Sequence, residues 1–162
     1  MTRIAVSRTV PVPHDRVWAA IADLGSHTEW MKDAERIVFV HDQHRGKGTR
    51  MEVVTVVGPF RTIDIMEVVG WDEGHSIEVA HQGLVKGRGT LAASPDGADR
   101  TTVSWDEDLI FPWWMGGPIT AWLARPVLAA IWRGNLKRLE EAVTMRGDDP
   151  PRTPASPDKE GG

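Results

Sequence analysis

The sequence predicts one α+β domain in which a curved, seven-stranded antiparallel sheet wraps around a long C-terminal helix, with two short helices between the first and second strands. Three observations predict this fold. Seven segments are rich in β-forming residues and alternate with a period of two, as strands do. Six of them follow one another with connections too short for parallel neighbours. One long amphipathic segment is the only element large enough to cover the apolar face of such a sheet.

The elements before the main run of strands are short. Alternation over residues 3–10 predicts a strand, which the sequence VPVP ends. The last proline of that sequence suits the first turn of a helix over residues 14–22, whose apolar residues recur at helical spacing. A second short helix is expected over residues 26–30.

Six further strands are expected next, separated by turn sequences that are rich in glycine, proline and aspartate. Their predicted ranges are residues 36–41, 49–57, 60–71, 75–82, 85–93 and 101–111. Because the connections are short, these strands are expected to form an antiparallel meander, which the first strand joins.

The apolar loop sequence FPWWMGG leads into the long helix, predicted over residues 118–146. Its apolar stripe falls at spacings of three and four residues and consists of Leu128, Trp132, Leu136, Leu139 and Val143. Because proline removes a helical hydrogen bond, Pro126 is expected to kink the helix or divide it near Trp122.

Chain length and composition indicate where the domain ends. Residues 1–146 are expected to form one domain, which suits a chain of 162 residues. Residues 147–162 hold four prolines and no large apolar residue, so they are predicted to be a disordered tail.

Charge and cysteine content exclude several classes of function. The net charge is -4 and the chain has no basic block interleaved with aromatics, which argues against a nucleic-acid partner. There is no cysteine, so disulfides and thiol catalysis are excluded. The opening residues do not read as a secretion signal and no run of about 18 apolar residues occurs, so a cytoplasmic location is expected.

Several short motifs occur in an order that carries a family resemblance. They are VPVP at residues 10–13, GKGT at 46–49, Glu67 followed by WD at 71–72, and TTVSW at 101–105. Over residues 2–143 the chain resembles the START-like superfamily, also called SRPBCC, in its branch of polyketide cyclases, dehydrases and lipid transport proteins. The resemblance implies the helix-grip fold of the birch-pollen allergen, with a deep cavity between the sheet and the C-terminal helix.

That resemblance does not imply one activity, because fold alone does not decide function. Members of the superfamily resemble lipid carriers, plant hormone sensors, aromatic polyketide cyclases, quinone-binding proteins and chaperone activators. This chain has no tyrosine, so a tyrosine-based proton relay is not available to it.

Two ionisable residues on expected cavity faces are the candidate catalytic pair. Glu67 shares a strand face with Ile63, Ile65 and Trp71, and a carboxylate in an apolar cavity can act as a general acid or base. His81 is expected to face the same cavity from the next strand. The alternatives are a Glu67 that pairs with an arginine and a His81 that is a hydrogen-bonded structural residue.

Large apolar side chains are the candidate binding residues. The predicted set is Trp18, Ile63, Ile65, Trp71, Val79, Trp105, Trp113, Trp114, Leu128, Trp132 and Leu136. The alternative is that the eight tryptophans simply fill a core. The loop that contains Trp113 and Trp114 is expected to pack under the helix, gate the cavity or make a transient membrane contact.

Other charged residues are expected to be structural. Glu107 lies in the acidic run of residues 106–108, which is expected to be solvated, and Arg88 is a candidate partner across the hairpin. His41 and His44 lack a third ligand nearby, so no metal site is predicted, and no cofactor is expected.

The leading hypothesis is therefore a binding protein that holds a lipid, an isoprenoid or a polyketide-like molecule in the cavity. One alternative is a polyketide cyclase or dehydratase that uses Glu67 and His81 as an acid/base pair in the same cavity. A second alternative is a protein-partner module, which an exposed Trp113 and Trp114 without an enclosed cavity would favour. The ligand and the oligomeric state stay open.

Overall fold

The computed structural model describes residues 2–147 of the 162-residue chain. The predicted tail, residues 147–162, lies outside the described residues apart from Gly147. The elements follow the predicted order of one strand, two short helices, six strands and one long helix. Each begins and ends within about two residues of its predicted range, the usual uncertainty of an element boundary.

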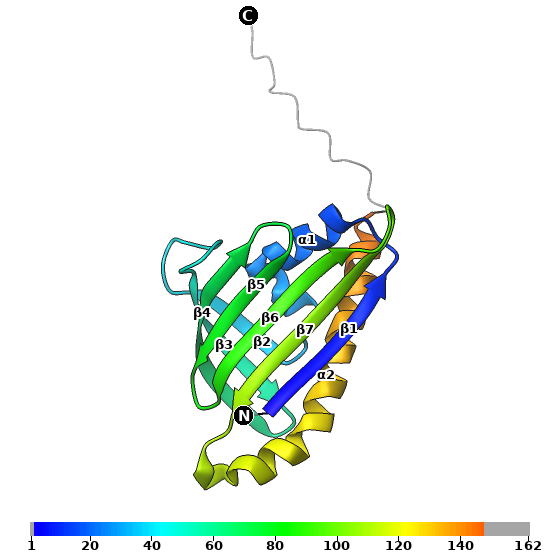
Figure 1. Ribbon diagram of the computed structural model, residues 1–162. Helices are drawn as coiled ribbons and strands as arrows, with labels where there is room; N and C mark the ends of the chain where they lie inside the picture. The colour runs from blue at the N-terminus through cyan, green and yellow to red at the C-terminus, as the bar shows by residue number, and fades with distance from the viewer. Residues whose placement is uncertain (1, 148–162) are drawn as a thin grey trace, which may run out of the picture.

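All seven strands form one antiparallel sheet with the spatial order β1-β7-β6-β5-β4-β3-β2, as Figure 1 shows. The strands are β1 Thr2–Val10, β2 Ala34–Phe39, β3 Arg50–Val57, β4 Phe60–Asp72, β5 Ser76–Gln82, β6 Lys86–Pro95 and β7 Thr101–Ile110. Strands β2 to β7 form the predicted meander, and β1 joins it by pairing with β7. The first two strands in the sequence therefore lie at opposite edges of the sheet.

Two short helices connect those edges. They are α1, His14–Ala22, and the 3-10 helix η1, Leu24–Glu29. The apolar face of α1 buries Val17 and Ile21 completely. Figure 1 shows α1 behind the upper end of the sheet, where it contacts β6 and the C-terminal helix. One end of the fold is closed in this way.

The long helix α2, Gly117–Met145, follows the short 3-10 helix η2, Trp113–Met115. Its second half runs alongside β1, whereas its first turns bend away below the sheet (Figure 1). The change of direction lies in the half that contains Pro126, where a kink was predicted, but the helix is continuous and is not divided there.

The packed core lies where α1 and the second half of α2 meet the sheet. Its most completely buried side chains include Ile4, Val10, Val17, Ile21, Leu136 and Leu139. The first half of α2 is different, because Ile119, Trp122 and Leu123 are exposed. Helix α2 therefore seals only part of the apolar face of the sheet.

Candidate functional site

A cavity of about 610 Å³ lies between the sheet and the first half of α2. This volume falls within the roughly 300–1,000 Å³ of typical small-molecule sites. Its walls are mostly apolar and include Met51, Met66, Ile77, Trp105 and Trp132. The apolar surfaces of the sheet and of α2 are therefore not packed against each other at this end of the molecule.

Strand β4 presents Thr62, Asp64 and Met66 to this cavity. The prediction had chosen the opposite face of the strand, and it was wrong. Ile63 is 59% exposed, and neither it nor Ile65 lines the cavity. Both faces of this segment carry apolar side chains, so alternation alone did not distinguish the face that lines the cavity from the outer face. Because side chains alternate, an error of one residue moves every side chain of the strand to the opposite face.

Glu67 lies on the outer face together with Ile63, so its predicted position inside the cavity was also wrong. Its carboxylate accepts a hydrogen bond from Gln82 Nε2 at 3.2 Å and lies 3.6 Å from Arg50 Nε. The pairing with an arginine is the alternative that the sequence had left open. Glu67 and His81 therefore do not form an acid/base pair in this cavity.

His81 of β5 does line the cavity, and two carboxylates flank it: Asp64 on the adjacent strand β4 and Glu107 on β7, beyond β6. Its Nδ1 lies 2.9 Å from Oδ2 of Asp64, and its Nε2 lies 3.8 Å from Oε1 of Glu107. The same oxygen of Glu107 accepts a hydrogen bond from Trp105 Nε1 at 2.9 Å. Asp64 and Glu107 are buried, so this acidic pair and its histidine form one polar cluster in an apolar wall.

The polar cluster of Asp64, His81 and Glu107 keeps the imidazole protonated. Burial by itself lowers the pKa of His81, but the hydrogen bond to Asp64 and the charges of Asp64 and Glu107 outweigh burial and raise the pKa to about 9. At neutral pH the cluster therefore contains a cation held between two acidic groups. Gly89 makes room for it, because a Cβ there would lie 3.0 Å from Cγ of Glu107.

A third carboxyl group, that of Asp33, lines the same cavity. Burial raises its pKa, an effect opposed by a hydrogen bond of 2.6 Å from Asn135 Nδ2. Asn135 is completely buried in α2, and its Oδ1 accepts from the backbone N–H of Lys32 at 3.1 Å and from Arg138. These bonds attach the segment before β2 to α2.

Four of the predicted binding residues line the cavity: Val79, Trp105, Leu128 and Trp132. The rings of Trp105 and Trp132 stack with a centroid separation of 5.3 Å and an interplanar angle of 16°. Leu136 lies outside the cavity, in the packed core, because it is one turn further along α2.

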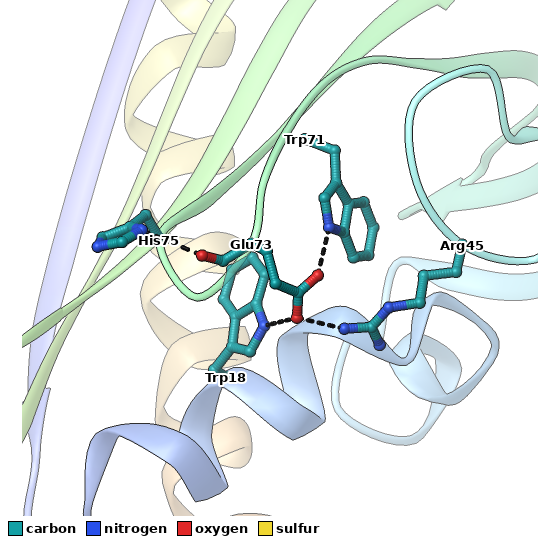
Figure 2. A network of polar contacts seen from close by, with 5 residues as sticks. All are labelled: Trp18, Arg45, Trp71, Glu73 and His75. Carbon is teal, nitrogen blue, oxygen red and sulfur yellow. Dashed lines mark hydrogen bonds and ion pairs between the residues drawn. The ribbon is translucent and has the colours of Figure 1, made fainter.

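Trp18 and Trp71 were also predicted to line the cavity, and this was wrong. Figure 2 shows them converging on Glu73, to which Trp18 Nε1 donates at 2.9 Å and Trp71 Nε1 at 2.7 Å. Arg45 pairs with the same carboxylate and lies over the Trp71 ring, and Nδ1 of His75 lies 3.1 Å from the Glu73 carbonyl oxygen. The hydrogen bonds from the two indoles lower the pKa of Glu73. These tryptophans therefore stabilise the β4–β5 turn against α1.

Trp113 and Trp114 do not line the cavity either. They are 86% and 62% exposed, whereas their neighbours Phe111 and Met115 do line it. The loop therefore lies at the mouth of the cavity, with its two indole rings on the outside.

Comparison with known proteins places the chain in a family. The model of the family described as polyketide cyclase/dehydrase and lipid transport matches residues 1–144. The chain belongs to this family. The resemblance inferred from the short motifs is thereby confirmed. No curated protein sequence matches the chain.

Solved structures share the fold of this family member. A Thermus thermophilus protein is 23% identical over 90% of this chain and 99% of its own, with a TM-score of 0.71. A START superfamily protein from Mycobacterium smegmatis is 17% identical over 90% and 99%, with a TM-score of 0.71. The Zhui aromatase/cyclase from a Streptomyces species is 17% identical over 90% and 94%, with a TM-score of 0.70.

The acidic members of the polar cluster in this family member were missed from the sequence. Glu107 was expected in solvent because of its acidic neighbours, yet it is buried, and Arg88 pairs with Glu78 instead. The alternation of β7 places Glu107 on the same face as Trp105, and this pattern predicted the burial of Glu107 better than its acidic neighbours did. For Asp64 the signal was an aspartate between two isoleucines, since aspartate is depleted in strands.

Residues 2–147 contain no group of three histidine, aspartate or glutamate side chains arranged to hold a metal ion. Among the same residues, no helix is long and apolar enough to cross a bilayer.

Proposed function

We propose that this protein binds one apolar small molecule, a lipid, an isoprenoid or a polyketide-like compound, in the cavity between the sheet and α2. The observation that carries the proposal is the cavity of about 610 Å³ with its largely apolar walls. Filling it with an apolar ligand contributes about 25 cal/mol for each Å² of apolar surface removed from water. Membership of a family of polyketide cyclases, dehydrases and lipid transport proteins supports the same class of ligand.

Native mass spectrometry of the purified protein, followed by organic extraction, tests this proposal. We expect a ligand at a stoichiometry near one per chain. The variant Ala124→Trp fills the cavity from α2 and should lose the ligand, because Ala124 lines the wall. Ala130→Trp is the matched control, since Ala130 is exposed on the same helix. A wild-type protein that carries no ligand and binds no hydrophobic dye would overturn the proposal.

A group of exposed apolar side chains, here called the rim, belongs to segments that also line the cavity. It consists of Phe60, Leu84, Ile110, Trp113, Trp114, Ile119, Trp122, Leu123 and Val127. They come from the start of β4, the β5–β6 turn, the end of β7, η2 and the first half of α2, which share the lower end of the molecule in Figure 1. Exposed apolar patches of this kind occur at membrane and protein interfaces.

Charge supports a membrane as the partner of the rim. Arg125 lies among the rim residues of α2, and residues 109–127 contain no acidic residue, although the whole chain has a net charge of -4. Cations beside an apolar surface attract anionic lipid headgroups, and tryptophan is favoured at the membrane interface. We infer that the rim makes transient contact with an anionic membrane, which gives an apolar ligand a direct route into the cavity.

Vesicle sedimentation tests the membrane contact. We expect binding to vesicles of phosphatidylglycerol and phosphatidylcholine, weaker binding to phosphatidylcholine alone, and loss of binding in the double variant Trp113→Ala, Trp114→Ala. The matched control is Trp71→Ala, which removes an indole far from the rim. Absence of sedimentation with either vesicle contradicts the inference, as does a stable dimer that the double variant dissociates.

Catalysis as a cyclase or dehydratase is the second candidate, and the protonated His81 between two carboxylates favours it. In this arrangement His81 would act as the acid, and the previously expected Glu67 has no part. Reloading the stripped protein with its extracted ligand discriminates between the two functions. A carrier returns the compound with its mass and its chromatographic retention unchanged, whereas an enzyme returns a compound that has lost water or a cyclised isomer with a different retention.

Only one of the two features that would favour a protein-partner module is present. Trp113 and Trp114 are exposed, but the fold also contains a cavity. The combination of an exposed rim with a cavity supports a ligand that enters from a surface.

A further inference from the structure

Carboxyl groups outnumber available cations in the lining of the cavity. The charged side chains of the described lining are those of Asp33, Asp64 and Glu107 and of His81 and Arg61. His81 lies between Asp64 and Glu107, so its single charge balances one of the two. Arg61 balances neither, because its Nη1 donates to both carboxylate oxygens of Glu35, outside the lining, at 2.7 and 2.8 Å. The apolar cavity is therefore left with an excess of negative charge.

One oxygen of Glu107 has no partner. Its Oε1 accepts from Trp105 Nε1 at 2.9 Å, lies 3.8 Å from His81 Nε2, and would lie 3.0 Å from a Cβ on Gly89. Within residues 2–147, no hydrogen bond engages Oε2, although Glu107 is only 7% exposed. Unlike the unpaired atoms of Asp64 and His81, Oε2 is not sealed off by protein. Since buried carboxylate oxygens are normally paired, a donor is missing here.

The carboxyl group of Asp33 adds to the negative charge around Glu107. Besides burial, the charge of Glu107 raises the pKa of Asp33, so the two groups are close enough to repel each other. Arg138 lies outside the lining and opposes this effect, but its guanidinium donates to the carbonyl oxygen of Trp30 and to Asn135 Oδ1. A buried charge without a counter-charge is costly, so these carboxyl groups favour an occupant that brings a positive charge.

The two stacked tryptophans of the wall lie beside these carboxyl groups. Trp105 holds Glu107 through its indole N–H. Trp132 lies three residues before Asn135 on α2, and Asn135 donates to Asp33 at 2.6 Å. Indole faces attract cations through the ring quadrupole. Carboxyl groups next to indole rings therefore form a favourable environment for an ammonium group.

Other polar ends fit this environment less well. A hydroxyl group could donate to Glu107, but it would leave the negative charge unbalanced. A carboxylate or a phosphate would add to that charge. His27, the remaining histidine of the lining, supplies no cation, because burial lowers its pKa to about 4 and its Nε2 lies 2.8 Å from the carbonyl oxygen of Ile21.

We propose that the ligand is an apolar molecule with a positively charged nitrogen, an amine or ammonium group, that lies beside Asp33 and Glu107. This inference rests on the proposed binding function and names the charge of the ligand's polar end. The hydrocarbon part then lies against the apolar wall formed by residues such as Met66 and Val79.

Displacement of Nile red from the stripped full-length protein tests the proposal with three probes that share a ten-carbon chain. At pH 7 decylamine is cationic, decanol is uncharged and decanesulfonate is anionic, and each is used below its aggregation limit. We expect decylamine to bind more tightly than decanol and at least about tenfold more tightly than decanesulfonate, the ratio that a difference of about 1.4 kcal/mol produces. Decanol or decanesulfonate binding as tightly as decylamine overturns the proposal.

The variant Ala124→Trp checks that the probes report on the cavity and not on the exposed rim. Because the new indole fills the cavity, Nile red binding and the ranking of the probes should both be lost. A ranking that persists in Ala124→Trp contradicts the proposal.

Two further variants test whether the carboxyl groups cause the preference. Asp33→Asn and Glu107→Gln each remove one negative charge and should reduce the preference for decylamine over decanesulfonate to about threefold or less. Asp106→Asn is the matched control, because it removes a carboxylate that lies on the outer face of β7 and pairs with Arg3. Thermal melting checks that each variant folds, and the wild-type ranking stands without them. A preference that survives both variants contradicts the proposal.

The two proposals fail in different ways. If neither Nile red nor any probe binds, the proposed function itself fails. If all three probes bind equally well, the protein binds apolar molecules but does not recognise a positive charge.

Discussion

Asp64 and His81 are 17 residues apart in the sequence, and they meet across β4 and β5 with Oδ2 of the aspartate 2.9 Å from Nδ1 of the histidine. Both side chains are almost completely buried in the wall of an otherwise apolar cavity. An ionised pair in such a place is stable only when its polar atoms are well paired.

The stability of the protein should depend on His81 in alkaline solution. The pKa of His81 is about 9 in the folded state, above the roughly 6.5 of an unfolded chain. Its stabilisation is therefore fully present below pH 6.5 and is lost as the pH rises through 9. Urea unfolding between pH 6 and 10 should show wild type losing up to about 3 kcal/mol more than His81→Gln. Parallel losses in the two proteins contradict the prediction.

His27 should make the protein sensitive to acid for the opposite reason. Burial lowers its pKa to about 4, so the unfolded chain takes up a proton at a higher pH than the folded one. Its contribution is fully present above roughly pH 6.5 and is lost as the pH falls towards 4. We expect the free energy of unfolding to fall less steeply over this interval in His27→Gln than in wild type. Equal slopes would show that His27 is not a buried neutral group.

The two halves of α2 should respond differently to the same truncation. Leu139 lies in the second half and is fully buried, whereas Leu123 lies in the first half and is 59% exposed. Leu139→Ala should reduce the free energy of unfolding by about 2–5 kcal/mol, because it removes packed methyl groups and leaves a void. Leu123→Ala should change it by less than about 0.5 kcal/mol. Chemical denaturation of both variants measures the difference, and similar losses would contradict the division of the helix.

Two glycine-to-alanine substitutions should have opposite effects. A Cβ at Gly89 would lie 3.0 Å from both Cγ and Oε1 of Glu107, so Gly89→Ala should displace that side chain and destabilise the protein by about 1–3 kcal/mol. Gly134 lies in α2, where a Cβ meets only the guanidinium of Arg138 at 3.5 Å and beyond. Gly134→Ala should therefore stabilise the protein by about 0.5–1 kcal/mol. Thermal melting of the two variants checks both signs, and a stabilising Gly89→Ala would refute the close packing around Glu107.

The order and type of the elements were predictable from the sequence, because both depend on local patterns. Strand alternation, turn residues and the stripe from Leu128 to Val143 are read within short windows. The sheet topology followed as well, since short connections permit only antiparallel neighbours. The prediction that sheet and helix enclose a cavity came from the same elements and from the family resemblance.

Only the tertiary structure decided which residues line the cavity. In β4, isoleucines occupy one face and Asp64, Met66 and Val68 the other, so the pattern did not identify the inner face until β3 and β5 were paired with it. The β-bulge between Val68 and Gly70 also shifts the alternation of inner and outer side chains before Trp71. Which side of a strand faces a cavity depends on what packs above it, and that information lies in distant parts of the chain.

The sequence by itself therefore determined the family, the number and order of the elements, and the apolar stripe of the C-terminal helix. Only the tertiary structure decided that Asp64 and Glu107, and not Glu67, accompany His81, and that Trp18 and Trp71 hold a surface turn. The physical reason is that helix and strand periodicity are local properties, whereas burial and the pKa of an ionisable group depend on neighbours brought together by folding.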